Sequence, residues 1–173
     1  NYVTFGGSPA TFVAVGASGT VLTSPNGSTW TTRTANAGTN ALNGVTFANN
    51  QFVAVGAGST AITGSLDGAT WTARTLPSTG FTVNRVAFGE GVYIAVSNTS
   101  NSYFTSADGI TWAQATPPLD HFNTGSIQTD GNAIALSSNG KYYWNTSESD
   151  FKVRAKVFKN IENLLIRQGT FTR

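Results

Sequence analysis

The chain has 173 residues, of which 39% are hydrophobic, so it is long enough and apolar enough to bury a core. Only 10% of its residues are charged, the formal net charge is +2, and six of the ten basic residues lie after position 151, so no basic patch for nucleic acid is indicated. It has no Cys and no apolar stretch of about 18 residues, which excludes disulfides, thiolate metal sites and a membrane-spanning helix.

Three short motifs recur along the chain in the same order and divide it into repeats. The first motif is Val3–Phe5, Val45–Phe47 and Val86–Phe88, with a weaker copy at Ser126–Gln128. The second is an apolar run found at Phe12–Gly16, Phe52–Gly56, Tyr93–Ser97 and Ala133–Ser137. The third begins at serines spaced by 41 residues and is found at Ser24–Trp30, Ser65–Trp71 and Ser106–Trp112, with a degenerate copy at Ser147–Val153.

Each repeat is expected to form about four short β-strands separated by turns. The apolar run has hydrophobic residues at consecutive positions, which is typical of a strand buried on both faces. The third motif predicts a hairpin, because Asn and Asp tolerate a positive φ, Gly adopts one freely, and β-branched and aromatic residues flank the turn. We therefore assign structural turn roles, with each tryptophan covering its own hairpin, to Asn26, Gly27, Trp30, Asp67, Gly68, Trp71, Asp108, Gly109 and Trp112.

The Ser-x-Asp-Gly-x-Thr-Trp pattern of the second and third copies resembles the Asp-box of bacterial neuraminidase (BNR) repeats, and the resemblance covers about residues 1–158. Such repeats occur in sialidases, sortilin-type receptors, some xyloglucanases, photosystem assembly factors, and phage and bacterial surface proteins. The resemblance implies an all-β, β-propeller-like fold with four blades at approximately 1–35, 36–76, 77–118 and 119–158. The family box has one more residue between Asp and Gly, so a different hairpin geometry is expected here.

After the repeats the composition changes, and residues 159–173 are expected to form a C-terminal tail or arm. Ile161, Leu164 and Leu165 have helical spacing and Gly169 could end a short helix, but an extended arm fits the sequence nearly as well. Either form could cap the last blade or bind a partner chain.

Asp67 and Asp108 are not expected to form a catalytic pair. Glycoside hydrolysis needs two carboxyl groups roughly 5 to 9.5 Å apart, whereas equivalent positions of successive blades should lie well apart. Asn26 fills the same place in the first box, and it can accept the same turn hydrogen bonds but cannot act as an acid or base. Sialidases of the family also use three arginines, one in a Phe-Arg-Ile-Pro-like motif, and that motif is absent here. Arg33 and Arg74 occupy equivalent repeat positions and are interpreted as blade-surface residues.

Two other titratable residues are candidates for a catalytic or metal-binding role. Glu90 lies between two glycines and is interpreted as a solvated turn residue, and His121, the only histidine, lies in a loop after two prolines. A metal site needs about three protein ligands, which an isolated Asp-His pair does not supply. No glycine-rich phosphate loop is present. The sequence therefore predicts no catalytic, cofactor-binding or metal-binding residues.

The fourth repeat carries an unusual aromatic run. Trp144 is aligned with core positions of the other repeats and is expected to pack inside, in the column of Val21, Ile62 and Tyr103. Tyr142 or Tyr143 is expected to face outward, where a ring with a hydroxyl can stack on a sugar or fill a protein interface. These two tyrosines are the candidate residues for contact with a glycan or a protein.

The leading prediction is a noncatalytic structural or adhesive β-propeller module, belonging to a phage virion or tail or to a bacterial surface protein. Alternatives are a fragment of a sialidase-like or other glycan-active propeller, and an assembly factor similar to photosystem stability factors. Four repeats expose sheet edges unless they are capped, closed or paired. We therefore expect assembly with copies of the chain, with virion neighbours or with missing sequence, a cell-surface glycan as a candidate ligand, and no cofactor, nucleic acid or membrane insertion.

Overall fold

The structure is a computed structural model that describes residues 2–89, 91–97 and 103–115 and the strands at 127–129, 134–138 and 141–145, with backbone only for 59–64, 115 and those last three strands. The described part consists of β-strands and two short 3-10 turns, η1 (Ala17–Gly19) and η2 (Ala57–Ser59), and it contains no α-helix. None of its helical segments is long and apolar enough to cross a membrane. The expectation of a β-rich fold is confirmed.

The strands form antiparallel sheets in which neighbours along the chain pair with each other. The first sheet contains β1 (Tyr2–Gly6), β2 (Thr11–Val15), β3 (Val21–Ser24) and β4 (Thr31–Arg33). The second contains β5 (Leu42–Ala48), β6 (Gln51–Gly56), β7 (Thr60–Gly64) and β8 (Trp71–Thr75). The third contains β9 (Val83–Gly89), β10 (Val92–Ser97), β11 (Tyr103–Ser106) and β12 (Ala113–Ala115). The last described sheet contains β13 (Ile127–Thr129), β14 (Ile134–Ser138) and β15 (Lys141–Asn145).

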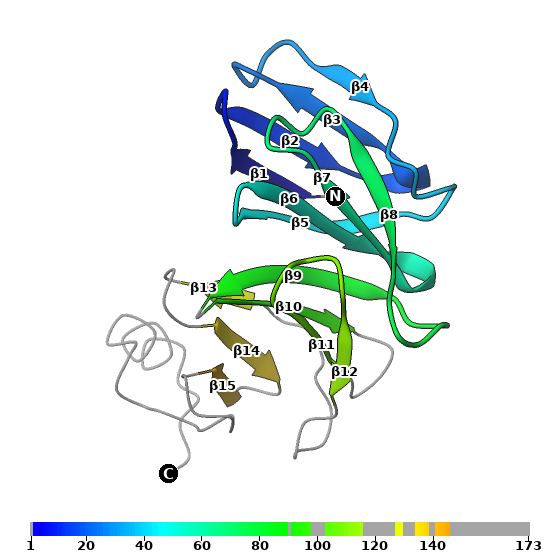
Figure 1. Cartoon of the computed structure of the whole chain (residues 1–173), viewed down its shortest axis with the longest axis vertical. Coiled ribbons are helices and arrows are strands. Elements are labelled where there is room, and N and C mark those ends of the chain that lie inside the picture. Colours follow the sequence, from blue (N-terminus) through cyan, green and yellow to red (C-terminus); the bar gives the residue numbers. More distant parts are fainter. Residues whose placement is uncertain are drawn as a thin grey trace, which may run out of the picture.

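The sheets are stacked in an arc, and no described sheet closes on itself (Figure 1). The first strand of each sheet contacts the first strand of the next, so β1, β5, β9 and β13 follow one another along the inner side of the arc. This arrangement is that of consecutive propeller blades. The predicted tail at 159–173 lies outside the described residues.

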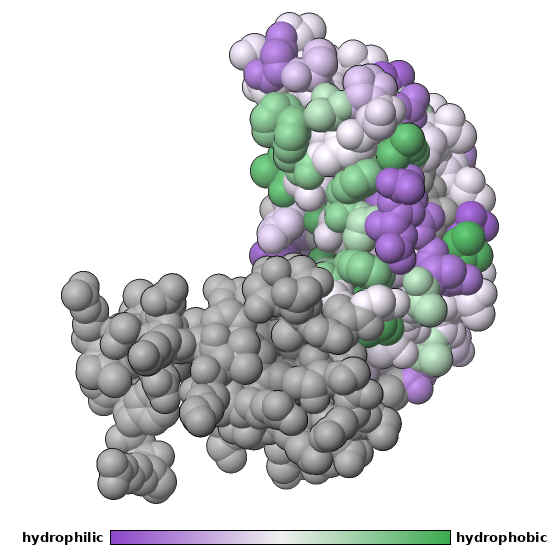
Figure 2. Space-filling model, turned by 60° about the vertical axis from the view of Figure 1, so that its left-hand side comes forward, coloured by the Kyte–Doolittle hydropathy of each residue, from purple (hydrophilic) through white to green (hydrophobic). Residues whose placement is uncertain are grey.

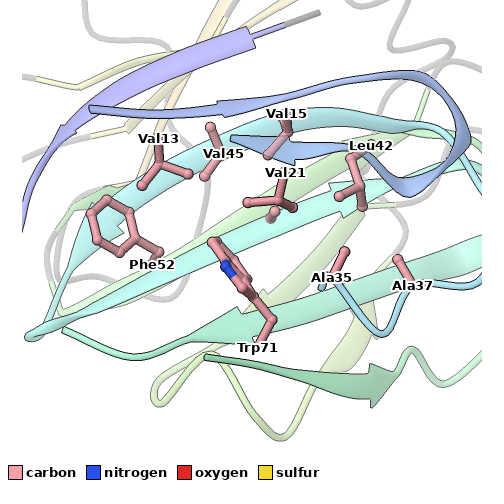
Figure 3. Close-up of a cluster of buried hydrophobic side chains, with 10 residues drawn as sticks. Val13, Val15, Val21, Ala35, Ala37, Leu42, Val45, Phe52 and Trp71 are labelled. Atoms are coloured by element: carbon pink, nitrogen blue, oxygen red, sulfur yellow. The ribbon is translucent and has the colours of Figure 1, made fainter. Parts of the chain in front are cut away.

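One hydrophobic core fills the space between the first and second sheets (Figure 3). The first sheet contributes Val13, Val15 and Val21, and Phe52 and Trp71 of the second sheet pack against them. All five side chains are at most 2% exposed. Burying a side chain of this size contributes roughly 1.5–3 kcal/mol, so this contact binds the two sheets firmly together.

A second core lies between the second and third sheets. Val53 and Val55 enter it from β6, whereas Phe52 and Ala54 of the same strand enter the first core. Strand β6 is therefore buried on both faces, as its consecutive apolar residues predict. The same holds for β10, but β2 alternates between buried and half-buried positions.

The strand register corrects two alignments of the fourth repeat. Tyr143 pairs with Leu136, as Val21 pairs with Val15 and Tyr103 with Val96, so Tyr143 and not Trp144 occupies that column. The reason is loop length, because these pairs span six residues in the first and second repeats but seven in the third and fourth. In the second repeat Val55 pairs with Ala61, so Ala61 and not Ile62 occupies the column. In the first motif, the valine column is continued by Gln128, which pairs with Ala135, and not by Ser126.

Candidate functional site

The three boxes lie at equivalent places in the fold, in the connection between the third and fourth strands of a sheet. Each connection is six residues long, covering 25–30, 65–70 and 107–112. The boxes are therefore hairpins, as the sequence predicts, although their connections are longer than a two-residue turn. Their geometry is set by the side chains of Ser, Asp or Asn, and Trp.

In the first box, Ser24 and Asn26 satisfy the backbone of the turn. The Ser24 Oγ accepts a hydrogen bond from the Gly27 amide at 2.9 Å. The Asn26 Oδ1 accepts hydrogen bonds from the amides of Ser28 and Thr29, both at 2.9 Å. The Ser24 hydroxyl also donates to Asn26 Oδ1, which joins the two side chains into one network.

The third box repeats this network with a carboxylate in place of the amide. The Asp108 Oδ1 accepts hydrogen bonds from the amides of Ile110 and Thr111 at 2.8 Å, and the Gly109 amide donates to Ser106 Oγ at 2.8 Å. In the second box, Asp67 accepts from the Ala69 amide at 3.0 Å and from the Ser65 hydroxyl. Asn26 and Asp108 thus make the same local bonds, whereas in the second box the Thr70 amide donates to Ser65 Oγ instead.

The positive backbone φ of the turn falls on glycine alone. Gly27, Gly68 and Gly109 have φ values of 74°, 68° and 71°, whereas Asn26 and the two aspartates are not in this region. The expectation that Asn or Asp would share the positive φ is therefore wrong. The longer connection needs only one such residue, and the preceding side chain instead accepts amide hydrogen bonds.

Each box tryptophan bonds to its own hairpin. The indole Nε1 donates to the carbonyl of the turn glycine three residues earlier, at 3.1 Å in Trp30, 2.7 Å in Trp71 and 3.1 Å in Trp112. In the second and third boxes the ring lies beside the aromatic residue of the apolar run, with centroid distances of 6.2 Å for Phe52–Trp71 and 6.4 Å for Tyr93–Trp112.

The electrostatics of the two carboxylates favour the ionised form. Hydrogen bonds from the Ser65 hydroxyl and then the Ala69 amide lower the pKa of Asp67. The amides of Thr111 and then Ile110 lower the pKa of Asp108. A general acid needs the opposite, a carboxyl group whose pKa is raised toward neutrality. These residues are chemically suited to closing turns.

The other titratable candidates are placed as follows. The Arg33 Nε donates to Thr23 Oγ1 at 2.8 Å, within its own sheet. Arg33 and Arg74 pair with equivalent positions of their neighbouring strands, Val21 and Ala61. Glu90 and His121 lie outside the described residues. Among the residues described, no three His, Cys, Asp or Glu side chains are grouped closely enough to hold a metal ion.

The candidate contact residues Tyr142 and Tyr143 lie on β15, whose backbone alone is described. Tyr142 pairs with Ser137 near the turn between β14 and β15, and Tyr143 pairs with Leu136. The columns of the other repeats at the Tyr143 position hold Val21 and Tyr103, which are buried. The side chains of β15 lie outside the described residues, so the role of the two tyrosines stays a prediction.

Polar contacts between the second and third sheets were missed by sequence reasoning. The Tyr93 hydroxyl donates to the Ala48 carbonyl at 2.7 Å, and Gln51 Nε2 donates to the Asp108 carbonyl. Arg85 donates to the Asn43 carbonyl at 3.0 Å. The side chains that donate these hydrogen bonds do not recur at the equivalent positions of other repeats. The repeat pattern therefore could not predict these contacts.

An apolar face of the first sheet was also missed. Val3, Phe5 and Trp30 are 53%, 55% and 39% exposed, and they belong with the half-buried Phe12 and Ala14 on the side of the first sheet away from the second. Figure 2 shows hydrophobic residues at the surface of this N-terminal part of the chain. A comparison between repeats would have found the face, because the counterparts of Val3 and Trp30 in the second and third repeats are buried and those of Phe5 are half-buried.

No family model and no curated protein matches the chain. Solved structures of β-propeller proteins do match its fold. A catalytically inactive variant of virginiamycin B lyase from Staphylococcus aureus, with quinupristin, matches with a TM-score of 0.73 at 14% identity, over 87% of this chain and 53% of the lyase. YCF48 from Cyanidioschyzon merolae matches with a TM-score of 0.60 at 20% identity, over 86% of this chain and 53% of that one. YCF48 bound to D1 peptide matches with a TM-score of 0.58 at 18% identity, over 81% of this chain and 48% of that one.

These similarities establish a β-propeller type of fold. At identities of 20% or less, these similarities are evidence for the fold and not for the function. The chain spans about half the length of the propeller proteins it matches.

Proposed function

We propose that the chain is a noncatalytic structural or adhesive β-propeller module, with four repeats of a shortened Asp-box type. The observation that supports this function is the use of Asp67 and Asp108 in turn closure, with Asn26 making the same bonds in the first box. The recurring carboxylates are thereby assigned to the scaffold. In three sheets, a motif of the Ser24–Trp30 type forms the hairpin between the third and fourth strands. This position supports the proposal that the repeats are BNR-like.

The proposed setting is a phage virion or tail, or the surface of a bacterium. Only 10% of residues are charged, and the polar surface is built from hydroxyl, amide and glycine groups. Such a surface suits recognition by hydrogen bonding and stacking, and a cell-surface glycan is the ligand class we propose. The outward contact residue on β15 would be Tyr142.

Binding of the fluorescently labelled chain to intact bacterial cells and to purified envelope polysaccharides tests this function. Saturable binding is expected, and Tyr142→Ala should weaken it while leaving the melting temperature unchanged. Thr32→Ala, which truncates an exposed side chain of β4, is the matched control and should bind as the parent does. Absence of binding to every cell and polysaccharide tested, or turnover of a sialoside substrate, would contradict the proposal.

A second candidate is a peptide-binding assembly factor. It is favoured by the similarity to YCF48, whose structure holds a D1 peptide. A peptide library of mixed composition, screened by fluorescence anisotropy alongside the polysaccharides, distinguishes the two. Peptide binding without polysaccharide binding would favour this candidate over the adhesive module.

A further inference from the structure

One position near the start of the first strand holds a different residue in each sheet. In every sheet this residue pairs with the last hydrophobic residue of the apolar run on the second strand. The four residues are Tyr2, Gly44, Arg85 and Ile127. The residue that follows it is valine in the first three repeats. The blade therefore does not fix the residue type at this position, which is available for another role.

The side chain of Arg85 extends from the third sheet to the first. Its Cζ lies 4.8 Å from the centre of the Tyr2 ring, within the range of a cation–π contact. Gly44 holds the same repeat position on the sheet between them, and a methyl group there would lie 3.0 Å from the Arg85 Cα. Glycine thus allows the second and third sheets to approach closely and places no side chain between Arg85 and Tyr2.

Hydrogen bonds orient the guanidinium of Arg85 through one of its nitrogens. Nη1 donates to the Asn43 carbonyl at 3.0 Å and to the Asn84 carbonyl at 2.9 Å. The Asn43 side chain in turn donates to the Val83 carbonyl at 3.1 Å, which joins the start of β5 to the start of β9. The guanidinium is therefore held in one orientation before a ligand binds, which lowers the entropic cost of binding.

Within the part of the chain that the structure describes, the charge of Arg85 has no anionic partner. Its Nε and Nη2 donate to no described residue. The two described carboxylates, Asp67 and Asp108, bond within their own hairpins. Arg85 is half-buried, and a partly desolvated cation is stabilised by an anion that neutralises it. The edge formed by Nε and Nη2 presents two parallel N–H donors, which match two oxygens of a carboxylate or phosphate.

We propose that Arg85, backed by the Tyr2 ring, is the anion-binding residue of a ligand site on the inner side of the arc. The site takes a carboxylate or phosphate group, which accepts hydrogen bonds from Nε and Nη2 while Nη1 stays bonded to the two carbonyls. The strands that carry these residues, β1, β5 and β9, follow one another along this inner side (Figure 1). This inference goes beyond the proposed function, because the site binds a small oxyanion whether or not the chain adheres to an envelope.

Titration of the isotope-labelled full chain with inorganic phosphate, and separately with acetate, tests the site by NMR of the arginine Nε–Hε signals. The Arg85 signal, identified by its loss in Arg85→Lys, should shift and saturate with at least one of the two anions. The expected dissociation constant is on the order of 1–10 mM. Sodium chloride at matched ionic strength controls for screening. The signal of Arg74, a half-buried arginine on β8, controls for nonspecific association and should not saturate.

Variants read from the backbone amide signals of β5 and β9 separate a binding role from a structural one. Arg85→Lys should weaken anion binding roughly 10-fold, since an ammonium group lacks the two-donor edge, whereas the matched control Arg74→Lys should bind as the parent does. Tyr2→Leu should weaken binding about 3-fold, and Tyr2→Phe, which keeps the ring, should not. Circular dichroism checks that each variant folds.

The titration of the parent chain decides the proposal even if Arg85→Lys does not fold, because the Arg85 signal can then be assigned through its contact with the Tyr2 ring. The proposal is overturned if the Arg85 signal only follows the chloride control, or if it moves no more than the Arg74 signal with both anions. Binding by a folded Arg85→Lys variant with the affinity of the parent would also overturn it.

Discussion

The first sheet and the two sheets that follow it have nearly the same sequence motifs but different surroundings. The boxes of all three are closed by Ser, by Asp or Asn, and by Trp, although Ser65 accepts from the Thr70 amide where Ser24 and Ser106 accept from the turn glycine. The burial of the apolar faces differs between the sheets, because β6 and β10 are buried on both sides and β2 on one side only. A repeated motif thus specifies its own hairpin locally, whereas the burial of its apolar residues depends on a neighbouring blade.

The largest effect on stability is expected when a buried tryptophan is compared with an exposed one. Trp71→Ala should lower the free energy of unfolding by about 3–5 kcal/mol, because it leaves a cavity in the first core. Trp30→Ala should cost about 1 kcal/mol, because the variant loses one hydrogen bond and little burial. Urea denaturation of each variant beside the parent measures both. Equal losses would contradict the difference between the sheets.

A smaller effect tests the part that the sheets share. Asp108→Ala should cost about 0.5–1.5 kcal/mol, because the exposed amides of Ile110 and Thr111 exchange the carboxylate for water. Asn26→Ala should cost a similar amount although it lies in the first sheet, since its bonds are local. Asp108→Asn is the conservative control and should retain most of the stability. If Asn26→Ala were harmless while Asp108→Ala was costly, the box would depend on its neighbours.

Tyr93→Phe tests the polar contact between the second and third sheets. It removes the hydroxyl that donates to the Ala48 carbonyl, and a cost of about 1 kcal/mol is expected. The ring itself should fit, because Phe52 occupies the same repeat position in the second sheet. Thermal unfolding of the variant beside the parent measures the loss, and a loss above that of Trp71→Ala would contradict this account.

The smallest effect is the pH dependence of the boxes. Asp67 and Asp108 have a lowered pKa in the folded chain, below the usual value of 3.8. Their contribution is therefore present above that value and is lost as the pH falls through the lowered pKa of the folded state. The effect is small because both carboxylates are solvent-exposed. The Asp67→Asn, Asp108→Asn double variant should lose less stability than the parent between pH 5 and 2, and an equal or steeper loss would contradict it.

Periodicity predicted the β-rich repeat and the box hairpins because both depend on residues close in sequence. It failed where loop length changed, since one additional residue before Tyr103 and Tyr143 shifts the strand register and moves Trp144 to another column. It also failed for the contact between Tyr93 and Ala48, because this pair is formed by two sheets and has no counterpart in the other repeats.

The sequence by itself determined the β-strand repeats, the order of the motifs and the local closure of each box, because backbone amides bond to side chains two to three residues away. Only the tertiary structure decided which apolar faces are covered. Val3 and Val45 are the same residue at the same repeat position, but one meets solvent and the other meets a preceding sheet. The burial of such a residue depends on whether another sheet packs against it, and the sequence of a single repeat does not specify this.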